Sequence, residues 1–407
     1  MMEQSLFLQT TTDDGMVNAN KSWKYQIFND YDEARNNSVD TVKINPIILR
    51  NINSSNIKAN LPSHTSLNIF ETIISRAIVS VVDHTTQVTH KLPAAEVRKF
   101  LQVPIENRFT NIEVTMEVST SLVLENDNVP PALFKNSLIS YYNRLKVERL
   151  DRRMNDKFSY QENCFAKYID GETYSNYKMA EFGASYWFHL VSGNQIYYLI
   201  KGDKRQENFY FEYYKDKQSY NSEFRDRTGS DSELRIELNA GESLFLPSGC
   251  IFAFYTIRDS MGYGGEVYTT DAVDTQNRIA HKQISGKCIR NWDYYDKFMN
   301  FNLFYGCRLL TELGRKYILT REELHQTTYF KKYCRAIIKT KPTAKRRERR
   351  GPFVRIRHDS FFKEFSTTSN TKAAKSKSLT PEKRYGKSAI QCLNAISRIA
   401  KKNSTNF

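Results

Sequence analysis

The sequence predicts a mainly β fold with flanking helices, and two observations support that prediction. Between about residues 150 and 285, apolar runs alternate with clusters of Gly, Asn, Asp and Ser. Many short strands separated by turns indicate an all-β barrel or sandwich, and an aromatic fraction of 13% suits large packed sheets. The expected strands are YWFHLV (186–191), QIYYLI (195–200), FYFEYY (209–214), LRIEL (234–238), SLFLP (243–247) and IFAFYTI (251–257).

The segments on either side of this β region have other patterns. Residues 66–83 begin like a short helix and end in a β-branched run, and residues 93–103 have helical spacing after Pro93. Residues 111–118 alternate apolar and polar side chains, as half-buried strands do, and residues 291–337 have the spacing of two or more helices. We therefore expect a disordered lead-in at 1–40, an α/β flank at 41–150, the β core at 151–285, C-terminal helices at 286–337 and a basic, largely disordered tail at 338–407.

The positive charge is concentrated at the end of the chain. From Lys331 to Phe407 there are 22 Lys and Arg against 4 Asp and Glu, a net charge of +18. The whole chain carries +15, so the other 330 residues carry −3. A basic arm on a nearly neutral body indicates a polyanionic partner such as DNA or RNA.

Several classes of protein do not fit the composition. No apolar run approaches the ~18 residues that span a bilayer, and the N-terminus lacks the basic and apolar regions of a secretory signal. We therefore expect no membrane partner. The 6 cysteines form no CxxC pair, which argues against a zinc module or a disulfide scaffold and favours reduced, mostly buried thiols.

Two blocks of the β region resemble the JmjC lysine demethylases, in the subgroup whose members also carry F-box or PHD modules. The first block is residues 174–200, and the second is LPSGCIFAFYTIRDSMGYGG at 246–265. The wider similarity spans roughly residues 40–330 and excludes the tail. The matching residues are Tyr174, Gly183, Ser185, Trp187 and His189 in the first block, and Pro247, Ser248, Gly249, Ile251, Ala253, Tyr255, Thr256, Asp259, Ser260, Gly264 and Gly265 in the second.

The resemblance implies a JmjC/cupin-type double-stranded β-helix. It also implies a chemistry in which Fe(II) and 2-oxoglutarate oxidise N-methyl groups on histone lysines. That chemistry needs two His and one carboxylate on the iron, and a cation for the distal carboxylate of 2-oxoglutarate.

The positions that align with the iron ligands carry other residue types. Without gaps, the first His aligns with Lys178 and the acid with Ala180; with a one-residue gap they align with Met179 and Glu181. The distal His aligns with Phe252, whose ring cannot donate to a metal. We expect side-chain packing, with a pair between Lys178 and a glutamate, to fill the old iron cavity.

The positions that align with the 2-oxoglutarate ligands have changed as well. The lysine aligns with Gln195, which lacks the charge, and a tyrosine aligns with Phe188, which lacks the hydroxyl. The threonine aligns with Ser175, which keeps a hydroxyl. We therefore expect no catalytic residue, no metal and no cofactor.

The remaining motifs point to no further chemistry. His189 lies in a predicted strand and is interpreted as a hydrogen-bonded core histidine, and His84 and His90 form only a loose pair. Residues 262–265, GYGG, lack the strand–loop–helix context of a phosphate loop and are interpreted as a turn.

Two features of the tail are candidate contact sites. A dense basic cluster is expected to serve nuclear import or to contact nucleic-acid phosphates in a salt-dependent manner. It consists of Lys341, Lys345, Arg346, Arg347, Arg349 and Arg350. Residues 387–402 have one apolar helical stripe flanked by lysines, which suits either a helix that docks on a protein partner or a solvated tail.

These observations favour a nuclear, chromatin-associated JmjC-like protein without catalysis, acting as a scaffold or as a histone and nucleic-acid binding factor. Its expected partners are a histone tail or nucleosome, and DNA or RNA through the tail. One alternative is an active Fe(II)/2-oxoglutarate-dependent histone demethylase with divergent ligands. Another is a nucleic-acid-binding protein whose β region is only an interaction module.

Overall fold

The computed structural model describes much of the first 300 residues. The described residues are 23–37, 45–50, 78–86, 88–103, 111–117, 137–139, 163–215, 221–228, 233–286, 298, 302 and 305. The chain divides into two compact units, Met1–Asn302 and Leu303–Phe407. Within the described ranges, no helix is long and apolar enough to cross a membrane.

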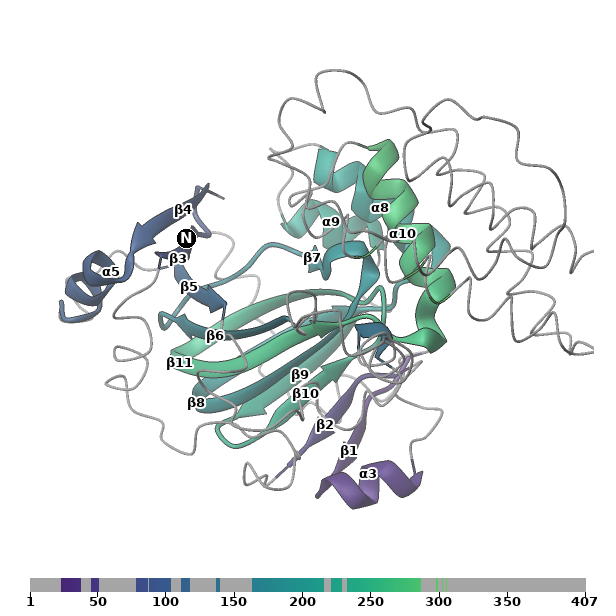
Figure 1. Cartoon of the computed structure of the whole chain (residues 1–407), viewed down its shortest axis with the longest axis horizontal. Helices are drawn as coiled ribbons and strands as arrows, with labels where there is room; N and C mark the ends of the chain where they lie inside the picture. The colour runs from purple at the N-terminus through teal and green to yellow at the C-terminus, as the bar shows by residue number, and fades with distance from the viewer. Residues whose placement is uncertain are drawn as a thin grey trace, which may run out of the picture. The chain divides into compact units, whose positions relative to one another are not determined.

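In the described part of the chain, one large sheet dominates the first unit, and this confirms the mainly β fold with flanking helices (Figure 1). Eleven described strands join it, in the order β1-β2-β10-β8-β11-β6-β5-β3-β4, with β9 beside β8 and β7 beside β11. The arrangement is consistent with a β-rich jelly-roll or cupin fold. The central strands are β6 (Asn163–Ile169), β7 (Lys178–Met179), β8 (Ser185–Ile200), β9 (Glu233–Asn239), β10 (Ser243–Leu246) and β11 (Ile251–Val267).

The strands β8 and β11 are longer than the sequence pattern predicts. The runs at 186–191 and 195–200 form one strand, because Gly193, at a φ of 95°, makes an irregularity within the β8–β11 ladder and not a turn. The turn expected at 262–265 is also wrong, because these residues continue β11. Close contact explains two of its glycines: a Cβ on Gly262 would lie 2.5 Å from the Phe188 ring, and one on Gly264 would lie 2.6 Å from the Phe165 ring.

The run FYFEYY is helical, which corrects the strand expected at 209–214. It lies in α8 (Lys204–Lys215), whose start is capped by Asp203 Oδ1, the acceptor for the backbone amides of Arg205 and Gln206. Aromatic residues favour strands in isolation, but here Tyr210 and Tyr213 pack into a buried aromatic cluster around Phe224. Tertiary packing thus overrides the local preference.

Two further helices lie beside α8 at one end of the long strands (Figure 1). They are α9 (Asn221–Thr228) and α10 (Val273–Ser285), and α10 occupies a region that the sequence pattern assigned to strands. The buried carboxylate of Glu207 on α8 binds Arg278 and Lys282 of α10, which fixes the two helices together. A short 3-10 helix, η5 (Thr270–Ala272), precedes α10.

The N-terminal part corrects one prediction and confirms two. Residues 23–37 are ordered, against the expected disorder of 1–40: β1 (Gln26–Phe28) pairs in parallel with β2 (Ile47–Leu49), and α3 (Tyr31–Asn37) follows β1. Burial of Trp23, Phe28 and Tyr31 supplies the apolar contact that the polar composition concealed. The predicted helix at 93–103 is α5 (Ala94–Leu101), and the predicted strand at 111–118 is β5 (Ile112–Glu117).

The hairpin of β3 (Ile78–Asp83) and β4 (Val88–Pro93) extends the sheet beyond β5. The strand expected at the end of 66–83 is therefore confirmed as β3, whereas residues 66–77 lie outside the described residues. Most of the C-terminal helices expected at 286–337 and all of the tail also lie outside them. The five-segment division stays a prediction.

Candidate functional site

The strand β7 brings Lys178 next to Phe252, two of the positions that align with iron ligands. Lys178 and Phe252 are direct cross-strand partners in the antiparallel β7–β11 pair. The Lys178 ammonium lies 5.5 Å from the centre of the Phe252 ring and 4.6 Å from that of Phe254. Such distances are those of cation–π contacts. The Tyr186 ring also packs against Phe252, with ring centres 4.8 Å apart.

A buried glutamate pairs with the lysine. Glu113 of β5 is 4% exposed, and its carboxylate lies 3.4 Å from Lys178 Nζ and 2.5 Å from Lys167 Nζ. His84, in the turn after β3, contacts the same carboxylate through Nε2 at 3.0 Å. We call His84, Glu113, Lys167 and Lys178 the buried ion cluster.

The protonation states in the buried ion cluster follow from this geometry. Burial alone would raise the pKa of Glu113, but the charges of Lys167 and Lys178 outweigh it and hold that pKa well below its ordinary value. Burial lowers the pKa of His84, because it disfavours the charged imidazolium more than Glu113 favours it. Glu113 is therefore ionised and His84 neutral near pH 7, which leaves two ammonium groups around one carboxylate.

The three positions that align with 2-oxoglutarate ligands are buried and engaged with the protein. Ser175 Oγ accepts a hydrogen bond from the backbone amide of Phe254 at 2.9 Å. Gln195 Oε1 accepts a hydrogen bond from the Tyr197 hydroxyl at 3.0 Å, and Gln195 Nε2 lies 3.5 Å from Thr256 Oγ1. Phe188 is 1% exposed and fills the space above Gly262.

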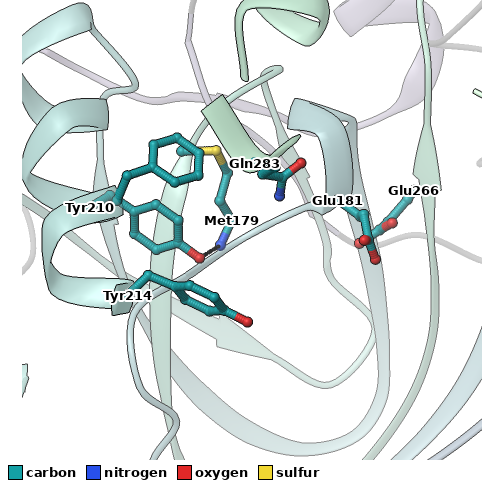
Figure 2. Close-up of a pocket in the computed structure, with 7 residues that line it drawn as sticks. Met179, Glu181, Tyr210, Tyr214, Glu266 and Gln283 are labelled. Carbon is teal, nitrogen blue, oxygen red and sulfur yellow. Dashed lines mark hydrogen bonds between the residues drawn. The ribbon is translucent and has the colours of Figure 1, made fainter. Parts of the chain in front are cut away.

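The other candidate ligand positions lie in a different environment. Ala180 is buried and directly precedes the 3-10 turn η3 (Glu181–Gly183). Met179 and Glu181 line a small pocket of about 70 Å³ (Figure 2). The pocket is lined by Met179, Glu181, Tyr210, Phe211, Tyr214, Glu266 and Gln283, and we call it the acidic–aromatic pocket.

The residues at the aligned positions do not fit a ferrous site of the expected kind. Such a site needs two imidazoles and one carboxylate, whereas Lys178, Ala180 and Phe252 offer an ammonium, a methyl group and a phenyl ring. In the register with a one-residue gap, Met179 and Glu181 offer a thioether and one carboxylate, and again no imidazole. Across the described residues, no group of three or more His, Cys, Asp or Glu side chains is placed to share a metal ion. Gln195 likewise provides no charge for a distal carboxylate.

Two interpretations of single residues are confirmed. His189 is 7% exposed and its Nδ1 lies 2.8 Å from Ser243 Oγ, so it is a hydrogen-bonded core histidine. Burial lowers the pKa of His189 to about 4. Cys164 and Cys250 are free and buried, as expected of reduced thiols, and burial raises the pKa of Cys164 to about 12.

The tail candidates lie outside the described residues. These are Lys341, Lys345, Arg346, Arg347, Arg349 and Arg350, and the stripe at 387–402. Their roles stay predictions.

The sequence pattern did not single out Glu113, Lys167 or Glu266. Glu113 stands on the polar side of the alternating segment 111–118, which a half-buried strand turns toward solvent. The signal that could have found the cluster is Lys167, a lone lysine in the otherwise uncharged strand NCFAKYI of β6.

Comparison with known proteins finds relatives of one class, the lysine-specific demethylases. The chain is 23% identical over 233 residues to lysine-specific demethylase 7A of Danio rerio. It is 22% identical over 296 residues to lysine-specific demethylase 7A of Xenopus tropicalis, and 24% identical over 248 residues to lysine-specific demethylase 2B of Mus musculus. The chain is similar to the JmjC lysine demethylases. These relatives support a relationship between the chain and the JmjC family. No protein-family model matches the chain.

The similarity to the JmjC demethylases covers the body of the chain and a minor part of each relative. The matched segments amount to 57%, 72% and 58% of this chain, but to 25%, 30% and 18% of the three relatives. The activity and partners of the relatives therefore extend to this chain only as a proposal.

Proposed function

We propose that this protein is a catalytically degenerate JmjC-like factor that binds chromatin and does not oxidise it. The β core acts as a scaffold or docking surface for a histone tail or nucleosome. The basic tail contacts DNA or RNA, and the protein works in the nucleus. The relatives are lysine-specific demethylases, and the changes at the aligned positions separate this chain from that activity.

The observation that carries the proposal is the environment of Lys178. Its ammonium lies between the Phe252 and Phe254 rings and the Glu113 carboxylate. A fixed positive charge at this point repels Fe(II), and the aromatic rings supply no metal ligand. Lys178 thus acts as an internal cation that satisfies the buried carboxylate where the family would hold iron.

The co-substrate positions support the same conclusion. Ser175 and Gln195 both hydrogen-bond to neighbouring strand residues and are fully buried. A 2-oxoglutarate molecule would have to break these bonds, and it would gain no cation at position 195 in return. Because an unpaired buried carboxylate is costly, binding would be weak.

The decisive experiment is calorimetric titration of the full chain with 2-oxoglutarate in the presence of Mn(II), a redox-inert substitute for Fe(II). We expect no binding of either ligand at millimolar concentration. Joint binding at micromolar affinity would overturn the proposal and support the alternative of an oxygenase with divergent ligands.

A designed variant serves as the positive control. The substitutions Lys178→His, Ala180→Asp and Phe252→His restore the family's donor types at the gapless positions. If those positions correspond to the iron site, the triple variant gains Mn(II) binding that the wild type lacks. A folded triple variant without such gain would show that the aligned positions do not converge as a metal site.

The chromatin part of the proposal needs its own measurement. We expect the full chain to bind nucleosomes, with an affinity that falls steeply as salt concentration rises. Deletion of residues 338–407 should reduce this salt dependence and leave histone-tail binding. Loss of all nucleosome and histone binding on deletion would favour the other alternative, in which only the tail makes contact.

A further inference from the structure

The acidic–aromatic pocket has one wall of aromatic rings and one wall of carboxylates. Figure 2 shows Tyr210 and Tyr214 of α8 on one side, and the carboxylates of Glu181 and Glu266 close together on the other. Glu181 comes from η3 and Glu266 from β11, so residues 85 apart in the chain converge on one cavity. The Met179 side chain lies between the two walls.

The aromatic wall is held in place by its neighbours. Tyr210 and Tyr214 are one helical turn apart, with ring centres 6.0 Å from each other, and Phe211 lies 5.4 Å from Tyr210. The backbone amide of Met179 donates a hydrogen bond to the Tyr210 hydroxyl at 3.2 Å, which fixes that ring to β7. Rings fixed in this way offer both apolar contact and the negative faces that attract cations.

The acidic wall stands on a turn that three side chains hold in place. Gln283 Oε1 of α10 accepts a hydrogen bond from the backbone amide of Phe182 at 3.0 Å. The Tyr268 hydroxyl donates a hydrogen bond to the backbone carbonyl of Glu181 at 3.2 Å. Ser248 Oγ donates to the Gly183 carbonyl at 2.5 Å. Gln283 is only 8% exposed and lines the pocket as well. The position of Glu181 is therefore set before any ligand arrives.

We propose that the acidic–aromatic pocket binds the cationic side chain of a lysine or arginine in an extended basic peptide. Two carboxylates brought together favour a positive charge between them and give it charge-assisted hydrogen bonds. Met179, Phe211 and the tyrosine rings match the methylene stem that carries such a charge. A pocket of about 70 Å³ admits one side chain, so the rest of the peptide lies outside it.

This inference rests on the proposed function, because it gives the chromatin-binding body a specific contact for a basic partner. It assigns that contact to a pocket separate from the buried ion cluster. Met179 and Lys178 are adjacent, yet Met179 lines the pocket, whereas Lys178 contacts Phe254 and Glu113.

The test is fluorescence polarisation with the full chain and short labelled Gly/Ser peptides that carry several lysines. Matched peptides carry arginine or uncharged norleucine at the same positions. We expect the lysine or arginine peptide, or both, to bind, and the norleucine peptide to bind about tenfold more weakly or not at all. The ratio of the first two affinities identifies which cation the pocket prefers.

Two variants connect the binding to the pocket. Glu181→Gln with Glu266→Gln keeps the shape of both side chains and should weaken binding about tenfold or more, with an unchanged circular dichroism spectrum. Glu212→Gln removes an exposed carboxylate from the outer side of α8 and should leave the affinity within about twofold of wild type.

Three results would overturn the inference. They are equal binding of the norleucine peptide, an unchanged affinity of the double variant, and a matching loss in Glu212→Gln. Calorimetric binding of Mg²⁺ or Ca²⁺ to the wild type but not to the double variant, without peptide binding, would make the pocket a metal site instead. The joint titration with Mn(II) and 2-oxoglutarate reports on the proposed function separately, because it measures oxygenase ligands and not a peptide. Repeating it with the Glu181→Gln and Glu266→Gln double variant shows whether any Mn(II) that binds is held by this pocket.

Discussion

Neighbouring residues of β7 contribute to two very different places. Lys178 joins the buried ion cluster, where every charge has an opposite charge or a hydrogen-bonding partner within 3.4 Å. Met179 lines the acidic–aromatic pocket, where the carboxylates of Glu181 and Glu266 converge around a cavity. The first place is filled by the protein's own side chains, and the second contains space.

The contrast between the two places suggests that the buried ion cluster serves stability and the acidic–aromatic pocket serves recognition. In the buried ion cluster, removing one charge leaves an oppositely charged neighbour without compensation in an apolar environment. The free energy of unfolding should therefore fall. In the pocket, Glu181 and Glu266 are partly solvent-exposed, so their charges cost less to maintain. We therefore expect substitutions in the cluster to change stability, and substitutions in the pocket to change binding.

The largest expected effect follows from Glu113→Gln. Loss of this carboxylate leaves Lys167, whose side chain is 9% exposed, without its counter-charge. We expect the free energy of unfolding to fall by about 3–5 kcal/mol, measured by urea denaturation.

Two controls accompany Glu113→Gln. Arg50→Ala removes an exposed ion pair with Glu242, where the arginine is 52% exposed, and should change stability by less than about 1 kcal/mol. Addition of Lys167→Met to Glu113→Gln should recover part of the loss, since it removes the unpaired charge. A loss below about 1 kcal/mol for Glu113→Gln would contradict the buried ion cluster.

The next effect is a loss of stability in acid that His189 causes. Its folded pKa of about 4 lies below the ordinary value of 6.5, so the unfolded state binds the proton more readily. The contribution is fully present above pH 6.5 and is lost as the pH falls toward 4. By linkage this amounts to about 3 kcal/mol.

Denaturation of wild type and His189→Gln between pH 7 and 4 measures this effect. The variant should lose less stability than wild type over that window, because it lacks the titrating ring. His90→Gln is the matched control, since His90 is exposed on β4. Parallel pH profiles for wild type and His189→Gln would show that His189 is not the responsible group.

A smaller effect is expected from Lys178→Met. The lysine side chain is 22% exposed and Lys167 remains beside Glu113, so we expect a loss of about 1 kcal/mol. The positive charge of Lys178 also lowers the pKa of His84, so its removal should raise that pKa. NMR titration of the His84 ring gives the direction, and an unchanged or lower value would contradict the cluster geometry.

The smallest effect on stability is expected in the pocket. Glu181→Gln with Glu266→Gln should change the free energy of unfolding by no more than about 0.5 kcal/mol, because both residues are partly exposed. Urea denaturation beside Glu113→Gln makes the comparison direct. A loss as large as that of Glu113→Gln would show that the pocket carboxylates are structural.

Much of the fold was predictable because strand alternation and helical spacing are local signals. The strands β5, β9, β10 and the helix α5 appear where their patterns place them. The errors have identifiable causes. The aromatic run of α8 looks like a strand until the Asp203 cap and the contacts with Phe224 are known, and Gly193 looks like a turn until the partner strand is present.

The candidate site was predictable only in part. The resemblance located Lys178, Phe252, Ser175 and Gln195, and the need to compensate a buried ammonium led to the expectation that Lys178 pairs with a glutamate. It could not indicate which glutamate, because Lys178 and Glu113 are 65 residues apart. The pocket escaped prediction altogether, since its walls come from a 3-10 turn, two helices and two strands.

The sequence by itself determined the mainly β character of the body, the separation of charge between body and tail, and the residue types at the aligned ligand positions. Composition and short-range periodicity are sufficient for these properties. Only the tertiary structure decided that Glu113 pairs with Lys178 and that Glu181 meets Glu266. Both depend on strand pairing between distant segments, and a side-chain period of two gives the alternation of a strand but not which of its faces is buried.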